Sequence, residues 1–297
     1  MSIQMKPKGL AITIIFEAES ANYGESIGNV ASLKKMSRGK GDQYTYISRQ
    51  ALRHNIVEQL DEDLAPVKAE GSGEKKVVQF ELDATIKDYP ELDFFGYLKT
   101  EKGGQGRKRS AKVRLSNAVS LEPFRGDLDF LTNKGLADRI NSNMNIAQAE
   151  IHRSYYRYTV TVDLDHIGID NPIPEEIHEI DKEERARRVE SLLDTVALLY
   201  RDIRGRREDL KPLFAIGGVY DIKNPVFSNT VDLKDGALQI DQIQSSMYKG
   251  IKENTKCGLV MGKFANENKI KAELNAINMP DFFESLKKDV RDYYERG

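Results

Sequence analysis

The ten residues from Tyr155 to Leu164 alternate between two kinds of side chain, and this pattern limits the fold more than any other segment. The predicted inward series is Tyr156, Tyr158, Val160, Val162 and Leu164. The predicted outward series is Arg157, Thr159, Thr161 and Asp163. A period of two is typical of a β-strand with one buried face. The chain is therefore expected to contain a sheet whose other face is polar and exposed.

Other segments set the order of elements around this strand. The expected elements are a strand at Gly9–Phe16, a helix from Ser48 to Leu60, a strand at Val77–Leu82, the strand at Tyr155–Leu164, a helix at Asp181–Arg204, and a strand pair at Leu213–Tyr220 and Val226–Leu233. Two C-terminal helices are expected near Gln239–Glu253 and Asp281–Glu295. The order predicts an α+β fold with the βαββαβ pattern of ferredoxin-like domains and RNA-recognition motifs, carrying large insertions.

Local signals mark the ends of these elements. Ser48 and Asp181 are good helix N-caps, and Gly205 is expected to end the second helix. The thirty residues before Ser48 are expected to form a long basic loop, because four glycines interrupt them. Further predictions are a flexible linker at Glu70–Glu74, a mobile basic loop at Gly103–Arg109, an extended segment at Ala111–Leu121, and a proline turn at Asp170–Pro174.

Composition excludes several classes of protein. The single cysteine, Cys257, allows no internal disulfide and no multi-cysteine zinc site, which favours a reducing, cytoplasmic setting. No stretch approaches the roughly 20 apolar residues of a membrane span. The first apolar run is followed at once by Glu17 and Glu19, so it is expected to be a strand rather than a signal peptide.

A net charge of −2 conceals strong segregation of charge. Residues 22–53 carry six lysines and arginines against two acids, and residues 99–114 carry seven against one. Residues 163–181 carry seven acids and no lysine or arginine. Such segregation favours a chain that binds an anion along one face, although solvated surface charge gives the same pattern.

Arg49 and Arg53 lie one turn apart on the predicted helix that Ser48 caps. Free backbone N–H groups and the positive end of the helix dipole occur at that position, and this arrangement suits a phosphate. The alternative is an exposed helix face with ordinary arginines.

The segment Ser48-Arg49-Gln50-Ala51-Leu52-Arg53 resembles the Ser-x-Gln-x-Leu-Lys/Arg motif of the CRISPR Cascade backbone subunit, in the RAMP superfamily. The resemblance is closest to the type I-B, DevR-like branch and extends from about Gly9 to Leu233. Supporting matches are Ile15–Tyr23, Phe94-Phe95-Gly96, Arg114-Leu115-Ser116-Asn117 and Ala215-Ile216-Gly217-Gly218.

The resemblance implies one RAMP-type domain over residues 1–297. A modified RNA-recognition-motif palm would span about 9–84 and 155–235, finger and thumb insertions about 85–154, and a C-terminal helical extension about 236–297. It further implies a non-catalytic cytoplasmic protein without cofactor, metal or membrane association. Its partners would be crRNA, target DNA, neighbouring copies of itself in a helical row, and other Cascade subunits.

The resemblance also implies the site residues. Guide-RNA backbone would contact Ser48, Arg49, Gln50 and Arg53, together with Asn22, Lys34, Lys35 and Arg38 in the preceding loop. Gly217 and Gly218 would permit close approach of RNA, since glycine has no Cβ; a tight strand turn is the alternative. A polar thumb within Thr132–Tyr155 would place Asn143, Met144, Asn145 and Ile146 near its tip. Apart from the resemblance, the basic run Arg107-Lys108-Arg109 is a candidate contact for target DNA or the guide, and a solvated loop is the alternative. Lys112 and Arg114 are further basic candidates.

Two other functions remain open at this stage. Related type III subunits cut target RNA with an aspartate in the loop after the first strand, where this chain offers only Asp42. The DevR-like name also suggests a regulator that binds duplex DNA, although no helix-turn-helix pattern is visible. Phosphate-binding and dinucleotide-binding glycine motifs are absent from the sequence, and none of the four histidines forms a His-x3-His pair.

Overall fold

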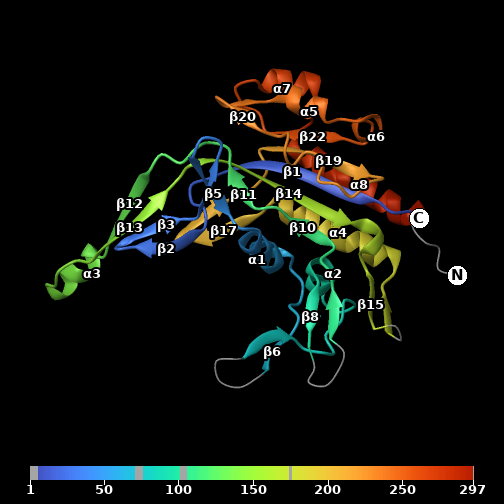
Figure 1. Ribbon diagram of the computed structural model, residues 1–297, viewed down its shortest axis with the longest axis horizontal. Helices are drawn as coiled ribbons and strands as arrows, with labels where there is room; N and C mark the ends of the chain where they lie inside the picture. The colour runs from blue at the N-terminus through green and yellow to red at the C-terminus, as the bar shows by residue number, and fades with distance from the viewer. Residues whose placement is uncertain (1–5, 71–75, 101–105, 174–175, 297) are drawn as a thin grey trace.

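A computed structural model describes residues 6–70, 76–100, 106–173 and 176–296. Its centre is an eight-stranded sheet in the order β22-β19-β1-β14-β11-β5-β4, with β10 paired to β14 (Figure 1). All its pairings are antiparallel. The strands are β1 (Gly9–Ala18), β4 (Lys35–Arg38), β5 (Asp42–Ile47), β10 (Val113–Leu115), β11 (Ala118–Ser120), β14 (Ser154–Asp163), β19 (Phe214–Tyr220) and β22 (Lys256–Leu259). The mixed α+β class is confirmed.

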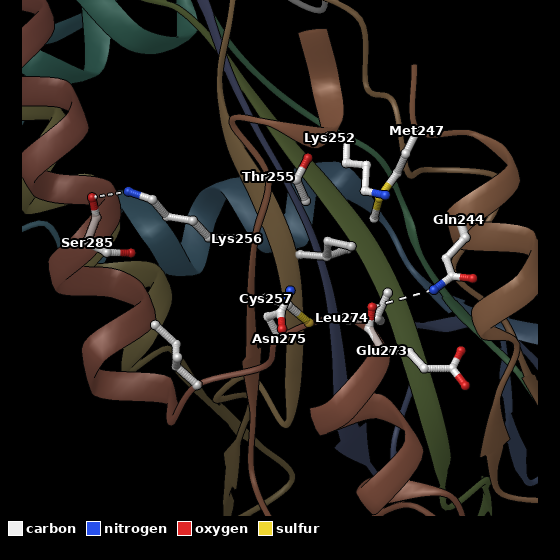
Figure 2. Close-up of a pocket in the computed structure, with 12 residues that line it drawn as sticks. Gln244, Met247, Lys252, Thr255, Lys256, Cys257, Glu273, Leu274, Asn275 and Ser285 are labelled. Carbon is white, nitrogen blue, oxygen red and sulfur yellow. Dashed lines mark hydrogen bonds between the residues drawn. The ribbon is translucent and has the colours of Figure 1, made fainter. Parts of the chain in front are cut away.

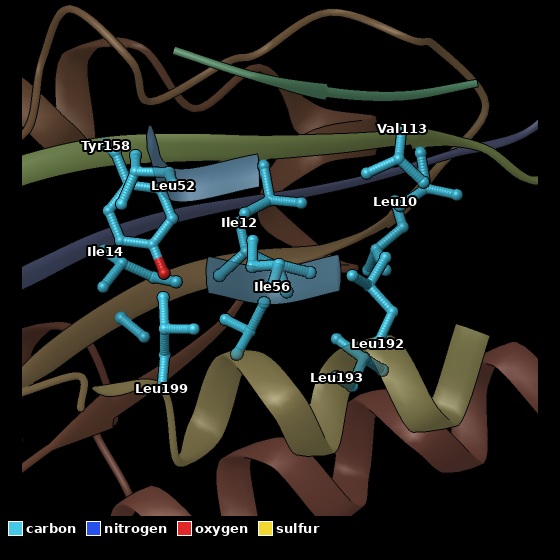
Figure 3. Packing of buried hydrophobic residues seen from close by; sticks show 14 of the residues in the cluster. Leu10, Ile12, Ile14, Leu52, Ile56, Val113, Tyr158, Leu192, Leu193 and Leu199 are labelled. Atoms are coloured by element: carbon cyan, nitrogen blue, oxygen red, sulfur yellow. The ribbon is translucent and has the colours of Figure 1, made fainter. Parts of the chain in front are cut away.

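One face of the sheet packs on three helices, α1 (Arg49–Gln59), α4 (Lys182–Ala197) and α8 (Met279–Arg296). Figure 3 shows Ile12 and Ile14 of β1 directed at Ile56 of α1 and at the helices below. Ser48 caps α1 as predicted, and its side chain accepts a hydrogen bond from the Ala51 amide. The strands predicted at Gly9–Phe16 and Tyr155–Leu164, and the last helix, are confirmed.

The other face of the sheet is also buried, so the predicted polar, exposed side of Tyr155–Leu164 is wrong. Residues 226–276 cover it with a second apolar cluster that includes Phe227 and Ile243 (Figure 1). Thr159 is buried and lies 2.9 Å from the Thr13 hydroxyl. Arg157 is half-buried and donates to the Val231 carbonyl. Because its polar side chains have hydrogen-bond partners, the second face of the strand can also be buried, although the alternating sequence predicts only one buried face.

The strand predicted at Val77–Leu82 is not part of this sheet. Its residues form β7 (Val77–Phe80), which pairs with β6 (Val67–Glu70) in a separate ribbon. After α1, the central sheet receives β10 and β11 instead, within the segment predicted to be extended. These strands have three residues each and are separated by Ser116 and Asn117, so they carry little periodic signal.

The helix predicted at Asp181–Arg204 is shorter than expected. Asp181 caps α4, but the helix ends at Ala197. Next come β17 (Tyr200–Ile203) and β18 (Arg206–Asp209), which form a hairpin. Gly205 therefore belongs to the hairpin turn, with φ of +76°, rather than to a helix end. Tyr200 happens to continue the helical spacing of the apolar residues, which explains the error.

Most of the predicted long loop before Ser48 is β-structure. It contains β2 (Tyr23–Ile27), β3 (Val30–Leu33), β4 and β5. β2 and β3 join β12 (Asp127–Thr132) and β13 (Ile146–Ile151) in a second sheet, ordered β12-β13-β3-β2. This sheet projects to one side in Figure 1, with α3 (Lys134–Ala137) and the 3-10 turn η2 (Asp138–Ile140) at its tip. Residues 127–151 are called the arm below.

A second projection is built from α2 (Pro90–Phe95), β6, β7, β8 (Tyr97–Lys99), β9 (Arg107–Arg109), β15 (Ile169–Ile173) and β16 (Glu176–Glu179). It is called the insertion lobe below, and Figure 1 shows it beneath the helices. Of the predicted proline turn, residues 170–173 belong to β15, whose pairing with β16 shifts register between Asp170 and Ile173. The predictions for residues 71–74, 103–105 and 174 lie outside the described residues.

The C-terminal part differs in detail from the predictions. The strand predicted at Val226–Leu233 is mainly turns, with only β20 (Leu233–Lys234) pairing to β21 (Ala237–Leu238). The helix predicted at Gln239–Glu253 is divided into α5 (Ile240–Ser245) and α6 (Lys249–Lys252). α7 (Glu267–Glu273) was not predicted. No helix in the described part of the chain is long and apolar enough to cross a bilayer.

Candidate nucleic-acid interface

The N-terminus of α1 is closed by oxygens of the chain itself. The Asn22 side-chain oxygen accepts from the Ser48 amide, and the Asn117 oxygen accepts from the Arg49 amide at 2.9 Å. The Ser48 hydroxyl accepts from the Ala51 amide at 3.3 Å. Free N–H groups are what make a helix N-terminus attractive to phosphate. The predicted backbone cradle is therefore largely occupied, and an anion here must be held mainly by side chains.

Two exposed cations lie by this helix start, and a third lies further along the neighbouring β4–β5 hairpin. Arg49 is the first residue of α1, and Gln50 beside it is also exposed. Lys34 is held nearby, because its amide donates to the Asn22 carbonyl at 2.6 Å and its carbonyl accepts from the Tyr46 amide at 3.1 Å. Arg38 lies further along the same hairpin, with its guanidinium 5.0 Å from the Tyr44 ring centroid. Lys34, Arg38 and Arg49 are called the cation face below.

No carboxylate in the described part of the chain forms an ion pair with Lys34, Arg38 or Arg49. Their charge is therefore available to an outside anion. Asn22 is predicted to contact RNA, but its side-chain oxygen accepts a hydrogen bond from the Ser48 amide and so holds the start of α1. Asn117 ends the segment Arg114-Leu115-Ser116-Asn117 and is not among the predicted site residues. Like Asn22, it accepts a hydrogen bond from a backbone amide at the start of α1.

Lys35 follows Lys34 in sequence but has a different environment. Its ammonium pairs with Glu150 at 2.7 Å, and the two side chains are only 18% and 16% exposed. The same ammonium lies 4.3 Å from the Phe124 ring centroid. Lys35 is thus engaged inside the chain, in contrast to the RNA contact predicted for it.

Arg53 is also unlike Arg49. Its guanidinium lies 4.8 Å from the Phe95 ring centroid, and the side chain is half-buried. Burial lowers the pKa of Arg53, against the opposing effect of Glu91. An arginine with a lowered pKa still carries its charge at neutral pH. Arg53 can therefore add to the field of the cation face, while also packing the helix against the insertion lobe.

The basic run at 107–109 belongs to β9, so the predicted mobile loop is wrong for these three residues. Arg109 is buried, pairs with Asp93, and donates to the His166 carbonyl at 3.0 Å. Arg107 pairs with Glu176 at 3.2 Å. Only Lys108 is exposed. The run is therefore mainly a structural element of the insertion lobe.

Lys112 and Arg114 lie at the edge strand β10. Lys112 donates to the Ser110 hydroxyl at 3.0 Å, and burial lowers its pKa. Arg114 pairs with Asp163 at 2.9 Å, with its side chain 49% exposed. Both remain accessible, but Arg114 already has an anionic partner.

Asn143 and Met144 are exposed near the arm tip, as predicted. The arm begins at Asp127, however, and not within Thr132–Tyr155. Nor is it simply polar, because it exposes the large apolar side chains Leu128, Phe130, Leu131, Leu136, Ile140, Met144 and Ile146. The alternation of Asp127-Leu128-Asp129-Phe130 in the sequence was the missed signal.

Gly217 and Gly218 lie within β19 and are buried. A Cβ at Gly217 would lie 2.1 Å from the Ala11 carbonyl oxygen, and one at Gly218 would lie 2.0 Å from the Asn254 oxygen. Neither the predicted RNA approach nor a turn explains them. They are required where the protein backbone passes close to itself.

A cavity of about 500 Å³ opens in the C-terminal part and is separate from the cation face (Figure 2). Cys257 and Leu274 are among the residues that line it, and Lys252 lies at its rim. Lys256 donates to the Ser285 carbonyl there. None of the predicted site residues lines this cavity.

Comparison with known proteins gives two kinds of match. A family model described as "CRISPR-associated negative auto-regulator DevR/Csa2" matches residues 10–238. A solved chain of a "CRISPR RNA-guided surveillance complex, pre-nicking" aligns with a TM-score of 0.61 at 11% identity, covering 95% of this chain and 100% of that chain. A chain of a "CRISPR RNA-guided surveillance complex" aligns with a TM-score of 0.50 at 14% identity, covering 94% and 98%. No curated protein sequence matches. At these identities the solved structures show a shared fold.

Proposed function

The chain belongs to the CRISPR-associated DevR/Csa2 family, and we propose that it is the guide-RNA-binding backbone subunit of a type I CRISPR surveillance complex. The family membership confirms the resemblance drawn from Ser48–Arg53. The observation that carries the proposal is the cation face, whose exposed charges have no ion-pair partner among the described residues. Such charges suit a backbone of phosphates, which binds by electrostatics without regard to sequence.

In this proposal the central sheet is a modified RNA-recognition-motif palm. The core order β19-β1-β14-β11, with α1 after β1 and α4 after β14, supports it, because ferredoxin-like domains have the order 4-1-3-2. The arm would be the thumb and the insertion lobe the finger-like insertion. The whole chain would then be one domain elaborated around this palm.

Neighbouring copies would lie in a row along one guide RNA. Support comes from the arm, which projects from the palm and exposes Phe130, Ile140 and Met144 to 60%, 76% and 48%. Exposed apolar patches of this kind are typical of interaction surfaces. Deleting residues 141–146 is expected to leave a folded monomer that forms shorter or irregular RNA–protein rods. Regular, full-length rods in electron micrographs would contradict this role.

We propose that the subunit has no catalytic role and leaves recognition of target DNA to guide pairing, with other Cascade subunits completing the complex. The ribonuclease alternative depends on Asp42, which is exposed at the start of β5. A cleavage assay on guide-paired RNA with added divalent metal separates the two. Cleavage that is lost in Asp42→Asn would establish the alternative.

The family description includes negative auto-regulation, which would require binding to the chain's own gene or transcript. Competition between single-stranded RNA and duplex DNA for the purified chain tests this. The proposal predicts that RNA displaces DNA, and that the chain carries RNA when purified from cells with a guide. Preference for duplex DNA would contradict the proposal.

A further inference from the structure

The arm is joined to its neighbouring hairpin by little regular structure. β13 pairs with β3 only through Gln148 with Val30 and Ala149 with Ala31. Figure 1 shows both hairpins leaving the palm together. Two backbone pairs give weak control over the angle of so long a projection. Other contacts must fix its direction.

Glu150, the residue after this pairing, provides three such contacts. Its carboxylate accepts from the Leu33 amide at 2.8 Å and pairs with the Lys35 ammonium at 2.7 Å. Its backbone carbonyl accepts from the Tyr23 hydroxyl at 3.1 Å. The Glu150 side chain is only 16% exposed, and Phe124 lies against the ammonium of Lys35. One half-buried carboxylate therefore joins β13 to the end of β3 and the start of β4.

These bonds continue to the start of α1. Next to Leu33, the Lys34 amide donates to the Asn22 carbonyl at 2.6 Å. The Asn22 side chain in turn accepts from the Ser48 amide, one residue before Arg49. A chain of hydrogen bonds between adjacent residues thus runs from the arm to the cation face.

We propose that Glu150 is the positioning residue that fixes the direction of the arm relative to the cation face. Its effect on RNA rests on the proposed function, in which arms and cation faces of successive copies follow one strand. A carboxylate suits the task because it accepts from a neutral amide and an ammonium together. Lys35 holds the Glu150 carboxylate in place and does not contact RNA. The contacts of Glu150 with Leu33, Lys35 and Tyr23 are called the anchor below.

Hydrogen exchange on the RNA-free chain tests the anchor without any assumption about function. Glu150→Ala is expected to raise exchange at the Leu33 amide and along β13 by about tenfold or more. Glu150→Gln keeps an acceptor for Leu33 but loses the charge opposite Lys35, so an intermediate increase is expected. The matched control is Arg153→Ala, because Arg153 lies two residues beyond the arm but pairs with Glu17 and is 75% exposed. It should exchange like the parent chain.

Binding to two lengths of single-stranded RNA tests the consequence. Affinity for an RNA of about six nucleotides, enough for one copy, should stay within about twofold in Glu150→Ala. Affinity for an RNA long enough for several copies should fall about tenfold, because misdirected arms cannot meet the next copy. Arg153→Ala should match the parent on both.

Unchanged exchange at Leu33 and β13 in Glu150→Ala would overturn the inference. So would an equal loss on short and long RNA, since Glu150 would then act on the binding surface itself. If the parent binds neither RNA, the proposed function fails and the exchange result alone decides the role of Glu150. Should Glu150→Ala not fold, the same comparisons are made with Glu150→Gln.

Discussion

Two basic segments of similar appearance in the sequence have opposite environments in the structure. In the cation face, Lys34, Arg38 and Arg49 are exposed and face no carboxylate in the described part of the chain. In the insertion lobe, Arg107 pairs with Glu176 on β16 and Arg109 pairs with Asp93 in α2. The difference shows that a run of positive charge indicates binding only where the fold leaves it without an internal partner.

The partner of Arg109 explains its burial. Asp93 is fully buried and also receives Arg188 from α4 at 3.3 Å and the Gly168 amide at 2.9 Å. Burial raises the pKa of Asp93, while the neighbouring arginines and the Gly168 amide oppose that rise. This cluster fastens the insertion lobe to α4. Positive charge in the lobe is therefore used for folding.

The strongest test of this contrast is Arg109→Ala. Removing Arg109 leaves the buried Asp93 carboxylate with only Arg188 and the Gly168 amide as partners. Breaking a buried pair in this way typically costs about 3–5 kcal/mol. A large drop in melting temperature is expected. If Arg109→Ala melts like the parent and instead binds RNA more weakly, the assignment of this arginine to folding is wrong.

The double variant Arg49→Ala/Arg53→Ala should act in the opposite way. A charge-assisted contact is worth about 1.5–3 kcal/mol, and an exposed one less, so RNA affinity should fall by tenfold or more. Stability should fall only slightly, chiefly from the lost contact between Arg53 and Phe95. Melting temperature and RNA affinity are measured on the same samples. Parental affinity with a lower melting temperature would make these arginines structural.

The sequence predicts both basic segments, but it does not predict which of them has internal partners. Ser48 as a cap and Arg49 as an exposed cation follow from local pattern, and so do β1, β14 and the start of α4. The burial of Arg109 depends on Asp93 and Arg188, which only the tertiary fold brings together.

The errors in the fold have the same physical origin. Alternation in Tyr155–Leu164 correctly predicts a strand, but covering of its second face depends on residues 226–276. β10 and β11 lie in the segment predicted to be extended, but the second strand of the βαββαβ pattern was assigned to Val77–Leu82, which pairs with β6 instead. Glu150 was not recognised, since its partners Leu33 and Lys35 are more than a hundred residues earlier.

Of these variants, Lys108→Ala is expected to change stability the least. It compares an exposed residue with a buried one in the same basic run, Arg107–Arg109. Lys108 lies between Arg107 and Arg109 but is exposed, with no ion-pair partner in the described residues. Its replacement should change the free energy of unfolding by less than about 0.5 kcal/mol. A loss approaching that of Arg109→Ala, measured by denaturant unfolding, would show that the run acts as a unit.

The salt dependence of RNA binding tests the central claim most directly. For single strands, log K falls with log salt by about 0.7 for each phosphate neutralised. Replacing Lys34 and Arg49 together by alanine should therefore flatten the slope by about 1.4, whereas Lys108→Ala should leave it unchanged. A parental slope in the Lys34→Ala/Arg49→Ala variant would mean that the cation face does not contact RNA, and would contradict the account.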